Sequence, residues 1–327
     1  MNKTLKIILN ILIFALIAGF GYYMFHSIKS DKKMIQSGEE NTENTFVSLY
    51  QKIDSFEAAS DIQCFDIYEN RIYVALSDKM SVFDLSGNPQ YDFTIEAGVR
   101  DIVIDRIENG TIYLLYPTKI DLYSFEKKKI YECKSCSDNS DYCAITTTKD
   151  YIFVTDAENK NIVQYDKQGR LVRFIKSPEG FIIPSYSFDI LNINDTLYCS
   201  NSGRHKIESY TSDGEFIASF GVAGTQAGAF AGCCNPVYLA KSIDGNILTS
   251  EKGNPRISSY GRDGEFRTIL FNSNLLGGGT VAYRMKVAGE NIYIAAGKTI
   301  SIYCRDAQLC VSTESCEGCP MRKECGR

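Results

Sequence analysis

Residues 64–84 read CFDIYENRIYVALSDKMSVFD. A short apolar segment is followed by a polar turn, by the apolar-aromatic-apolar triplet Ile72-Tyr73-Val74, by a second turn, and by a segment that ends in the aromatic Phe83. Short apolar and aromatic segments separated by polar turns are typical of consecutive β-strands. This stretch therefore predicts one small unit of β-sheet.

The same arrangement recurs five more times along the chain. The triplets of the second strands begin at Ile72, Ile112, Ile152, Leu197, Ile247 and Ile292. The aromatics of the third strands are Phe83, Tyr123, Tyr165, Tyr210, Tyr260 and Tyr303, spaced by 40, 42, 45, 50 and 43 residues. Self-similarity at this period, with four short strands a unit, predicts propeller blades, which bury their faces only by packing against one another. We therefore predict an all-β, six-bladed β-propeller over residues 45–308.

The last blade needs an outer strand, and two segments could supply it. Phe46–Tyr50 (FVSLY) is apolar and free of Gly and Pro, and Leu309–Val311 (LCV) could serve from the C-terminal side. The N-terminal segment is preferred because it would tie the two ends of the ring together.

The first 44 residues differ from the rest in composition. After a flank at 1–6, residues 7–25 are apolar except for Asn10, and as a helix they would rise about 28 Å, close to the thickness of the hydrocarbon core of a bilayer. No small-residue cleavage site follows, so we predict an uncleaved transmembrane signal anchor. Residues 26–44 are polar and aperiodic, which indicates a flexible tether.

The charges that flank the predicted span are nearly balanced, with Lys3 and Lys6 before it and Lys29, Lys32 and Lys33 after it. The prediction of membrane orientation therefore depends on the twelve cysteines, because so many are unusual in a protein of the reducing cytosol. We expect the propeller on the extracytoplasmic (periplasmic) side of the membrane. The alternative is a cytoplasmic domain with buried free thiols.

The composition of the chain limits the classes of partner that it is expected to bind. The formal net charge is −5 over 327 residues, which argues against a nucleic-acid partner, because binding phosphates requires a basic surface. The hydrophobic fraction of 44% and the charged fraction of 23% are those of a globular protein.

Residues 200–266 contain a basic residue followed by Ile before a strand, a D-G-E-F turn, an F-G-x-x-G-x-x-x-G-x-F run, and a Pro before the next inner strand. In these features the segment resembles the NHL-repeat propellers of membrane-anchored bacterial type. The resemblance is close in blades four and five and extends only to the strand pattern elsewhere. It implies a propeller used mostly to bind proteins, nucleic acids or small ligands. Enzymes related to this family place metals in the central channel on His or carboxylate ligands.

A catalytic role is not expected from these residues. The chain has two histidines, His26 in the tether and His205 in a turn, so a His-based metal site is disfavoured. We find no complete catalytic constellation, and a carboxylate-based hydrolase or lyase is the weakest alternative. No cofactor is expected apart from the cysteine sites described below.

Propeller topology places the turns between second and third strands on the face where each inner strand begins. Every blade carries a cation there, and we expect this basic face to surround the channel and attract an anion. The alternative is that these residues serve turn chemistry alone. The ligand-binding residues predicted on this face are Lys252, Arg256, Glu251, Asn235, Arg204, Arg284 and Arg100.

Cysteines form three groups with possible chemistry. The adjacent Cys233 and Cys234 could form a vicinal disulfide, pair with other cysteines or bind a soft metal, which makes them redox candidates. Cys133 and Cys136 form a C-x2-C pair. The tail, residues 309–327, carries four cysteines that can form two disulfides, the preferred interpretation, or hold zinc or an iron–sulfur cluster. These four are Cys310, Cys316, Cys319 and Cys325.

These observations predict two alternative functions. The first is a membrane-tethered binding or scaffold propeller that engages a protein or an anionic ligand through its basic channel face. The second is an extracytoplasmic redox or electron-transfer component with an iron–sulfur or zinc site in the cysteine-rich tail.

Overall fold

A computed structural model describes residue 19, residue 22 and residues 48–105 and 110–305. The chain divides into two units, Met1–Val47 and Ser48–Arg327, and the account below concerns the second. Among the described residues no helix is both long and apolar enough to cross a membrane. The predicted anchor at 7–25 lies outside the described residues except for Gly19 and Tyr22, and the predicted tether lies wholly outside them.

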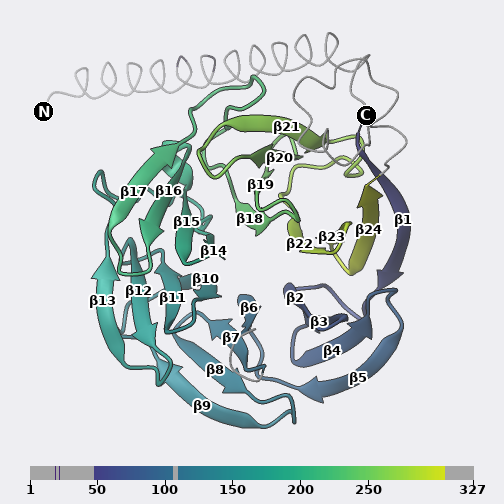
Figure 1. Ribbon diagram of the computed structural model, residues 1–327, viewed down its shortest axis with the longest axis vertical. Helices are drawn as coiled ribbons and strands as arrows, with labels where there is room; N and C mark the ends of the chain where they lie inside the picture. Colours follow the sequence, from purple (N-terminus) through teal and green to yellow (C-terminus); the bar gives the residue numbers. More distant parts are fainter. Residues whose placement is uncertain (1–18, 20–21, 23–47, 106–109, 306–327) are drawn as a thin grey trace, which may run out of the picture. The chain divides into compact units, whose positions relative to one another are not determined.

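Ser48–Arg327 contains six four-stranded antiparallel sheets arranged as blades around a central channel (Figure 1). The innermost strands are β2 (Cys64–Tyr68), β6 (Asp101–Ile104), β10 (Tyr142–Thr147), β14 (Ile190–Ile193), β18 (Tyr238–Lys241) and β22 (Arg284–Ala288). The second strands are β3 (Arg71–Ala75), β7 (Ile112–Tyr116), β11 (Tyr151–Asp156), β15 (Thr196–Asn201), β19 (Ile247–Glu251) and β23 (Asn291–Ala296). The third strands are β4 (Lys79–Asp84), β8 (Lys119–Tyr123), β12 (Asn161–Asp166), β16 (Lys206–Thr211), β20 (Arg256–Tyr260) and β24 (Thr299–Arg305). The outer strands are β1 (Tyr50–Glu57), β5 (Pro89–Thr94), β9 (Lys129–Lys134), β13 (Leu171–Ile175), β17 (Phe216–Phe220) and β21 (Phe266–Phe271), and a short 3-10 helix, η1 (Ser202–Arg204), precedes β16.

The N-terminal strand closes the ring, as predicted. Strand β1 pairs with β24 and completes the sixth blade, which joins the beginning of the propeller to its end. The strand runs over Tyr50–Glu57, so of the described residues in the expected segment Phe46–Tyr50 only Tyr50 belongs to it. Two aromatic contacts explain this position, because Tyr50 packs on Phe271 at 5.5 Å between ring centroids and Phe56 packs on Phe83 at 4.9 Å.

The repeated aromatic has one structural role in every blade. Each third-strand aromatic pairs across the strands with the first residue of the second-strand triplet, as in Phe83 with Ile72 and Tyr210 with Leu197. All six aromatics are buried between blades. Burial of a side chain of this size stabilises the fold by roughly 2–3 kcal/mol. The repeat therefore encodes the packing of blade on blade.

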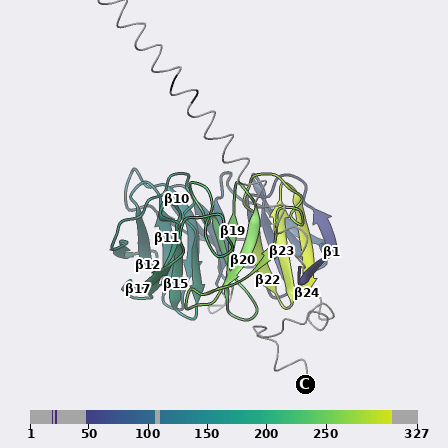
Figure 2. The same cartoon turned by 90° about the horizontal axis from the view of Figure 1, so that it is seen from above.

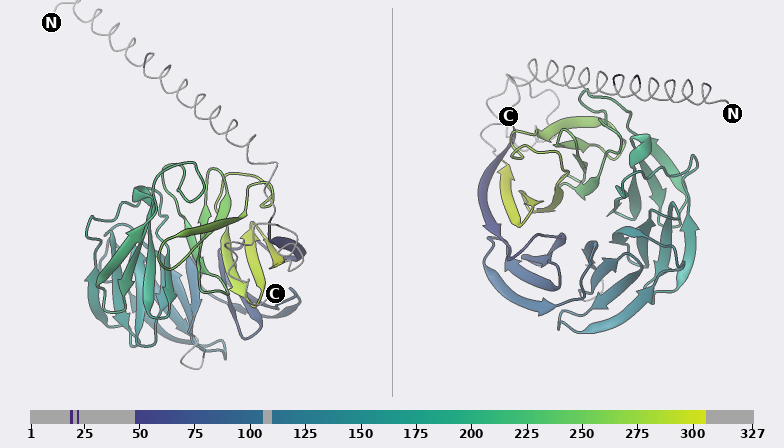
Figure 3. Two further views of the ribbon diagram at one scale, coloured as in Figure 1. Left: turned by 45° about the horizontal axis from the view of Figure 1, so that its top comes forward. Right: turned by 180° about the vertical axis from the view of Figure 1, so that it is seen from behind.

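Carboxylates at the inner strands join neighbouring blades. Asp66 Oδ2 accepts a hydrogen bond from the backbone N–H of Ile104 in the next blade at 3.0 Å. Asp101 Oδ2 likewise accepts a hydrogen bond from the backbone N–H of Ile145 in the following blade at 3.0 Å. These bonds hold the inner strands in register around the channel. The right panel of Figure 3 shows the ring of blades from behind, and Figure 2 shows the blades edge-on.

Candidate functional site

A cavity of about 380 Å3 opens where the inner strands begin. We call it the mouth cavity. Every blade contributes to its wall, and the polar residues that matter most are Gln63, Arg100, Ser185, Asp189, Tyr238 and Arg284. A second cavity of about 440 Å3, the channel cavity, follows the inner strands past Asp66, Asp101 and Lys286. Asp189, Tyr238 and Arg284 line both cavities and so lie at the boundary between them.

Arg284 reaches across the channel. It begins β22 in the sixth blade, and its Nη1 lies 3.1 Å from Asp101 Oδ1 of the second blade. Its Nη2 donates to the Arg100 carbonyl oxygen at 2.6 Å. The guanidinium also lies over the Tyr238 ring, 4.6 Å from its centroid. Arginine suits this position because one planar group satisfies a carboxylate, a carbonyl and an aromatic face together.

Arg100 presents a second guanidinium in the mouth cavity. Its Nη1 donates to the Tyr142 carbonyl oxygen at 2.9 Å and also to Asp141 Oδ1. Its side chain is 34% exposed, and within the described part of the chain no protein acceptor is recorded for Nε or Nη2. These donors can therefore bind an acceptor group that enters from solvent.

Asp189 is the carboxyl group of this site. Its Oδ1 accepts from the Ile190 N–H at 2.9 Å and its Oδ2 accepts from the Leu239 N–H of the next blade at 2.6 Å. Burial, together with the nearby charge of Asp101, raises its pKa to about 7, although the Leu239 hydrogen bond and the charge of Arg284 oppose the shift. Asp189 can thus hold or release a proton near neutral pH.

The predicted basic face is not a face of uncompensated positive charge. Four of its lysines form ion pairs with carboxylates that lie on outer strands and on connections between blades. The pairs are Lys79–Asp92 at 2.9 Å, Lys119–Glu132 at 3.2 Å, Lys206–Glu179 at 3.1 Å and Lys298–Glu57 at 2.7 Å. Arg100 and Arg284 are also paired, but they alone of the predicted arginines line the mouth cavity.

Arg256 and Glu251 are buried, although the sequence predicted them on an open surface. Arg256 Nε lies 2.6 Å and Nη2 lies 3.0 Å from the two carboxylate oxygens of Glu251. The same guanidinium donates to the Ala229 carbonyl and, at 3.5 Å, to that of Thr225. Arg256 is 8% exposed and Glu251 is 1% exposed. The pair therefore fastens the connection between β17 and β18, and its donors and acceptors are occupied.

Asn235 also has a structural role. Its Nδ2 donates to the Lys252 carbonyl oxygen at 2.9 Å, and its Oδ1 accepts from the Lys252 N–H at 2.9 Å. The amide thereby joins the connection before β18 to the turn between β19 and β20 and fixes the position of Lys252.

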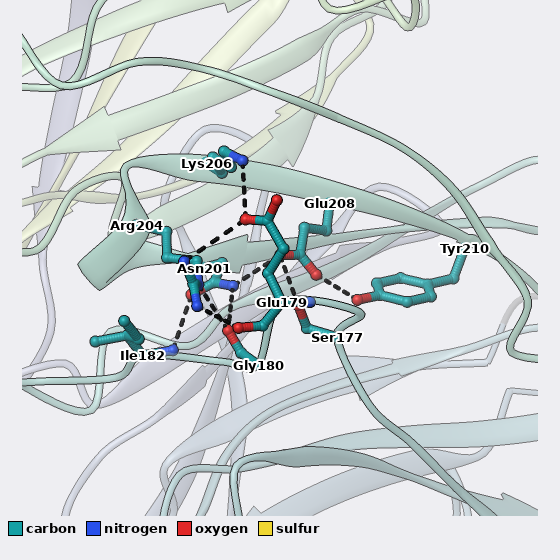
Figure 4. Close-up of polar contacts among 9 residues, drawn as sticks. All are labelled: Ser177, Glu179, Gly180, Ile182, Asn201, Arg204, Lys206, Glu208 and Tyr210. Carbon is teal, nitrogen blue, oxygen red and sulfur yellow. Dashed lines mark hydrogen bonds and ion pairs between the residues drawn. The ribbon is translucent and has the colours of Figure 1, made fainter.

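Blade four holds a buried polar network (Figure 4). Glu208 Oε1 accepts from Ser177 Oγ at 2.9 Å and from Asn201 Nδ2 at 2.7 Å, and Oε2 accepts from the Tyr210 hydroxyl. The predicted site residue Arg204 donates to the Gly180 carbonyl oxygen at 2.9 Å. Together these bonds hold the connection that leads to Ser185 and Asp189, so Arg204 supports the site from outside it.

The structure describes eight of the twelve cysteines. Cys233 and Cys234 lie together, with 2.9 Å between their Sγ atoms. Cys310, Cys316, Cys319 and Cys325 lie outside the described residues. The eight cysteines that the structure does describe, Cys133 and Cys136 included, are free. Over residues 48–105 and 110–305 no cluster of three or more His, Cys, Asp or Glu side chains could hold a metal.

Comparison with known proteins supports the fold. No protein-family model matches the chain. No curated protein matches it either. Among solved structures, virginiamycin B lyase from Staphylococcus aureus superposes with a TM-score of 0.56 at 14% identity, covering 78% of this chain and 98% of that one. A Bacteroides thetaiotaomicron protein of unknown function superposes with a TM-score of 0.56 at 13% identity, covering 78% of this chain and 75% of its own. These likenesses show the six-bladed propeller fold alone.

Of the residues predicted to bind a ligand, Arg100 and Arg284 line the mouth cavity. Asp189 and Tyr238, which also line it, and Asp101, which pairs with Arg284, were not among the predicted residues. A signal for the carboxylates was available, because Asp-Ile recurs at the inner strands as Asp66-Ile67, Asp101-Ile102 and Asp189-Ile190. No comparable pattern marks Tyr238, whose place under Arg284 depends on the packing of blade five against blade six.

Proposed function

We propose that this protein is a binding propeller, a divergent relative of the NHL-repeat type, tethered to the outer side of a membrane by its N-terminal segment. It takes a small anionic ligand, of the carboxylate class, into the mouth cavity. The observation that carries this proposal is the convergence of Arg100 and Arg284, from the second and sixth blades, on one cavity of about 380 Å3.

The chemistry of the cavity favours a carboxylate. A guanidinium matches a carboxylate with two parallel N–H donors, and Arg100 offers Nε and Nη2 in that geometry. Near neutral pH the protonated form of Asp189 is populated, which reduces its repulsion of an anion. The remaining charges are balanced by the pairs Arg100–Asp141 and Arg284–Asp101.

An aromatic rim favours a ligand with an apolar part. Tyr186 lines the cavity, is 63% exposed, and has a φ of 55°, a conformation that a tyrosine rarely adopts without support from its surroundings. Tyr238 lines the same cavity and also the channel cavity. Aromatic walls with a few placed polar groups are typical of small-molecule sites.

Titration of the purified chain with benzoate tests this proposal, with benzylamine as a cation of similar size and shape. We expect benzoate to bind and benzylamine not to bind. Arg100→Gln and Arg284→Gln should each weaken benzoate at least about tenfold, which corresponds to ~1.4 kcal/mol. Arg267→Gln is the matched control, because Arg267 is an exposed arginine on the outer strand β21 and does not line the cavity.

Thermal unfolding of each variant separates a lost contact from a lost fold. Weakened binding by a folded Arg100→Gln supports the proposal. Equal benzoate affinity in Arg100→Gln, Arg284→Gln and Arg267→Gln would refute it, and so would tighter binding of benzylamine than of benzoate.

A further inference from the structure

Two cysteines meet at the rim of the propeller, beside the mouth cavity but outside its wall. Cys233 is exposed, whereas Cys234 is 1% exposed, and their Sγ atoms lie 2.9 Å apart. Cys234 Sγ also lies 3.3 Å from Ser185 Oγ. The surrounding backbone is fixed, because Asn235 joins this segment to the turn that carries Lys252.

The environment of the pair shifts the pKa values of its two thiols in opposite directions. Burial opposes ionisation of Cys234, but hydrogen bonds from Cys233, Ser185 and Lys252 and the charge of Lys252 outweigh it and lower the pKa of that thiol. The hydrogen bond to Cys234, with some burial, raises the pKa of Cys233. One sulfur is thus accessible and protonated, and its neighbour is enclosed and disposed to be a thiolate.

We propose that Cys233 and Cys234 form a redox-active site that closes into a vicinal disulfide by exchange with a small-molecule disulfide. This site is independent of the ligand proposed for the mouth cavity. Cys233 is the attacking residue because a reagent can reach it, and Cys234 is the resolving residue because a reagent cannot.

The exchange balances in two steps. Cys233 Sγ attacks one sulfur of the reagent R–S–S–R, its proton passes to Cys234 Sγ, and RS⁻ leaves, which gives a mixed disulfide on Cys233. Cys234 then loses that proton to RS⁻ or to solvent and attacks Cys233 Sγ, and the second RS⁻ leaves. The cysteine pair is oxidised by two electrons and the reagent disulfide is reduced to two thiol equivalents.

Chain geometry makes this bond reversible and not a permanent structural link. Adjacent Cα atoms across a trans peptide are about 3.8 Å apart, below the usual disulfide span of about 4.4–6.8 Å. A vicinal disulfide is therefore strained and easily reduced, which is typical of labile and not of structural disulfides.

The test uses the full chain, reduced, freed of reductant and incubated with bis(2-hydroxyethyl) disulfide. Remaining thiols are then alkylated under denaturing conditions and the chain is digested with trypsin. The peptide 207–241 reports on the site, since it contains Cys233, Cys234 and no other cysteine. We expect it to become unalkylated and lighter by two hydrogen atoms.

Two single variants separate the roles. Cys234→Ser should accumulate a hydroxyethylthio adduct on Cys233, because no resolving thiol remains. Cys233→Ser should leave Cys234 free, because the reagent cannot reach it. A stable adduct on Cys233 in the unchanged chain would overturn the proposal, and so would an adduct on Cys234 in Cys233→Ser, or an unreacted peptide while the exposed Cys136 is modified.

Lys252 supplies a kinetic test. Lys252→Gln should slow closure near pH 7 by about fivefold to tenfold, since the thiolate fraction of Cys234 falls as its pKa rises. Lys160→Gln is the matched control, because Lys160 is an exposed lysine on the corresponding turn of another blade. Equal closure rates in the two variants would refute the part assigned to Lys252.

Discussion

Replacing Arg256 with alanine is expected to destabilise the propeller by about 3–5 kcal/mol, the usual cost of leaving one member of a buried ion pair alone. In the native chain Glu251 Oε1 is 2.6 Å from Arg256 Nε and Oε2 is 3.0 Å from Nη2. Without the guanidinium, the 1% exposed carboxylate would keep only the Ala231 N–H at 3.3 Å. The carbonyls of Ala229 and Thr225 would also lose their donor.

The assay is thermal and urea unfolding followed by circular dichroism. For a domain of this size about 3–5 kcal/mol corresponds to a fall of roughly 6–20 °C in Tm. The control is Arg267→Ala, which breaks exposed pairs with Asp263 at 3.0 Å and Glu265 at 2.8 Å and should cost about 0–1 kcal/mol.

Two further results would support the mechanism. Burial already raises the pKa of Glu251, so in Arg256→Ala the carboxyl group should bind a proton readily and the loss should be smaller at pH 5 than at pH 8. The double variant Arg256→Met with Glu251→Leu should recover most of the stability, because no charge remains buried. A loss no larger than that of Arg267→Ala would refute the reasoning.

Other changes have expected outcomes of the same kind. The pKa of Asp189 is about 7 in the folded chain against its ordinary value of 3.8, so the folded chain binds more protons than the unfolded chain between these values, and its stability should fall as pH rises from about 4 to 7. Asp189→Asn should flatten this fall, which urea midpoints taken across that range would show. An anion beside Asp189 favours its protonated form, so benzoate should bind at least about fivefold more weakly at pH 8 than at pH 6, because two like charges about 4 Å apart repel by ~1 kcal/mol even in water. A titration showing equal affinity would contradict this. Glu208→Gln should cost about 2 kcal/mol in urea unfolding, since it disturbs three hydrogen bonds to a buried carboxylate, whereas the exposed Glu265→Gln should stay within about 0.5 kcal/mol.

The sequence by itself determined the number of blades and the packing between them. Phe83, Tyr123 and their four counterparts recur because every blade needs a large side chain at the same point of its third strand. Because each blade has the same packing requirement, the same residue type recurs at a regular spacing in the sequence, and that spacing predicts the architecture. Closure by the N-terminal strand was predicted as well, although its start at Tyr50 depended on contacts with Phe271 and Phe83.

Only the tertiary structure decided which charged residues line the mouth cavity. Arg256 and Arg284 each begin a strand, but one is enclosed with Glu251 and the other reaches across the channel to Asp101. The partner of Arg256 lies five residues away in sequence, whereas the partner of Arg284 lies 183 residues away. Electrostatic pairing depends on distance in space and not on order along the chain. The mouth cavity and its carboxyl group therefore became visible only when six blades met around one axis.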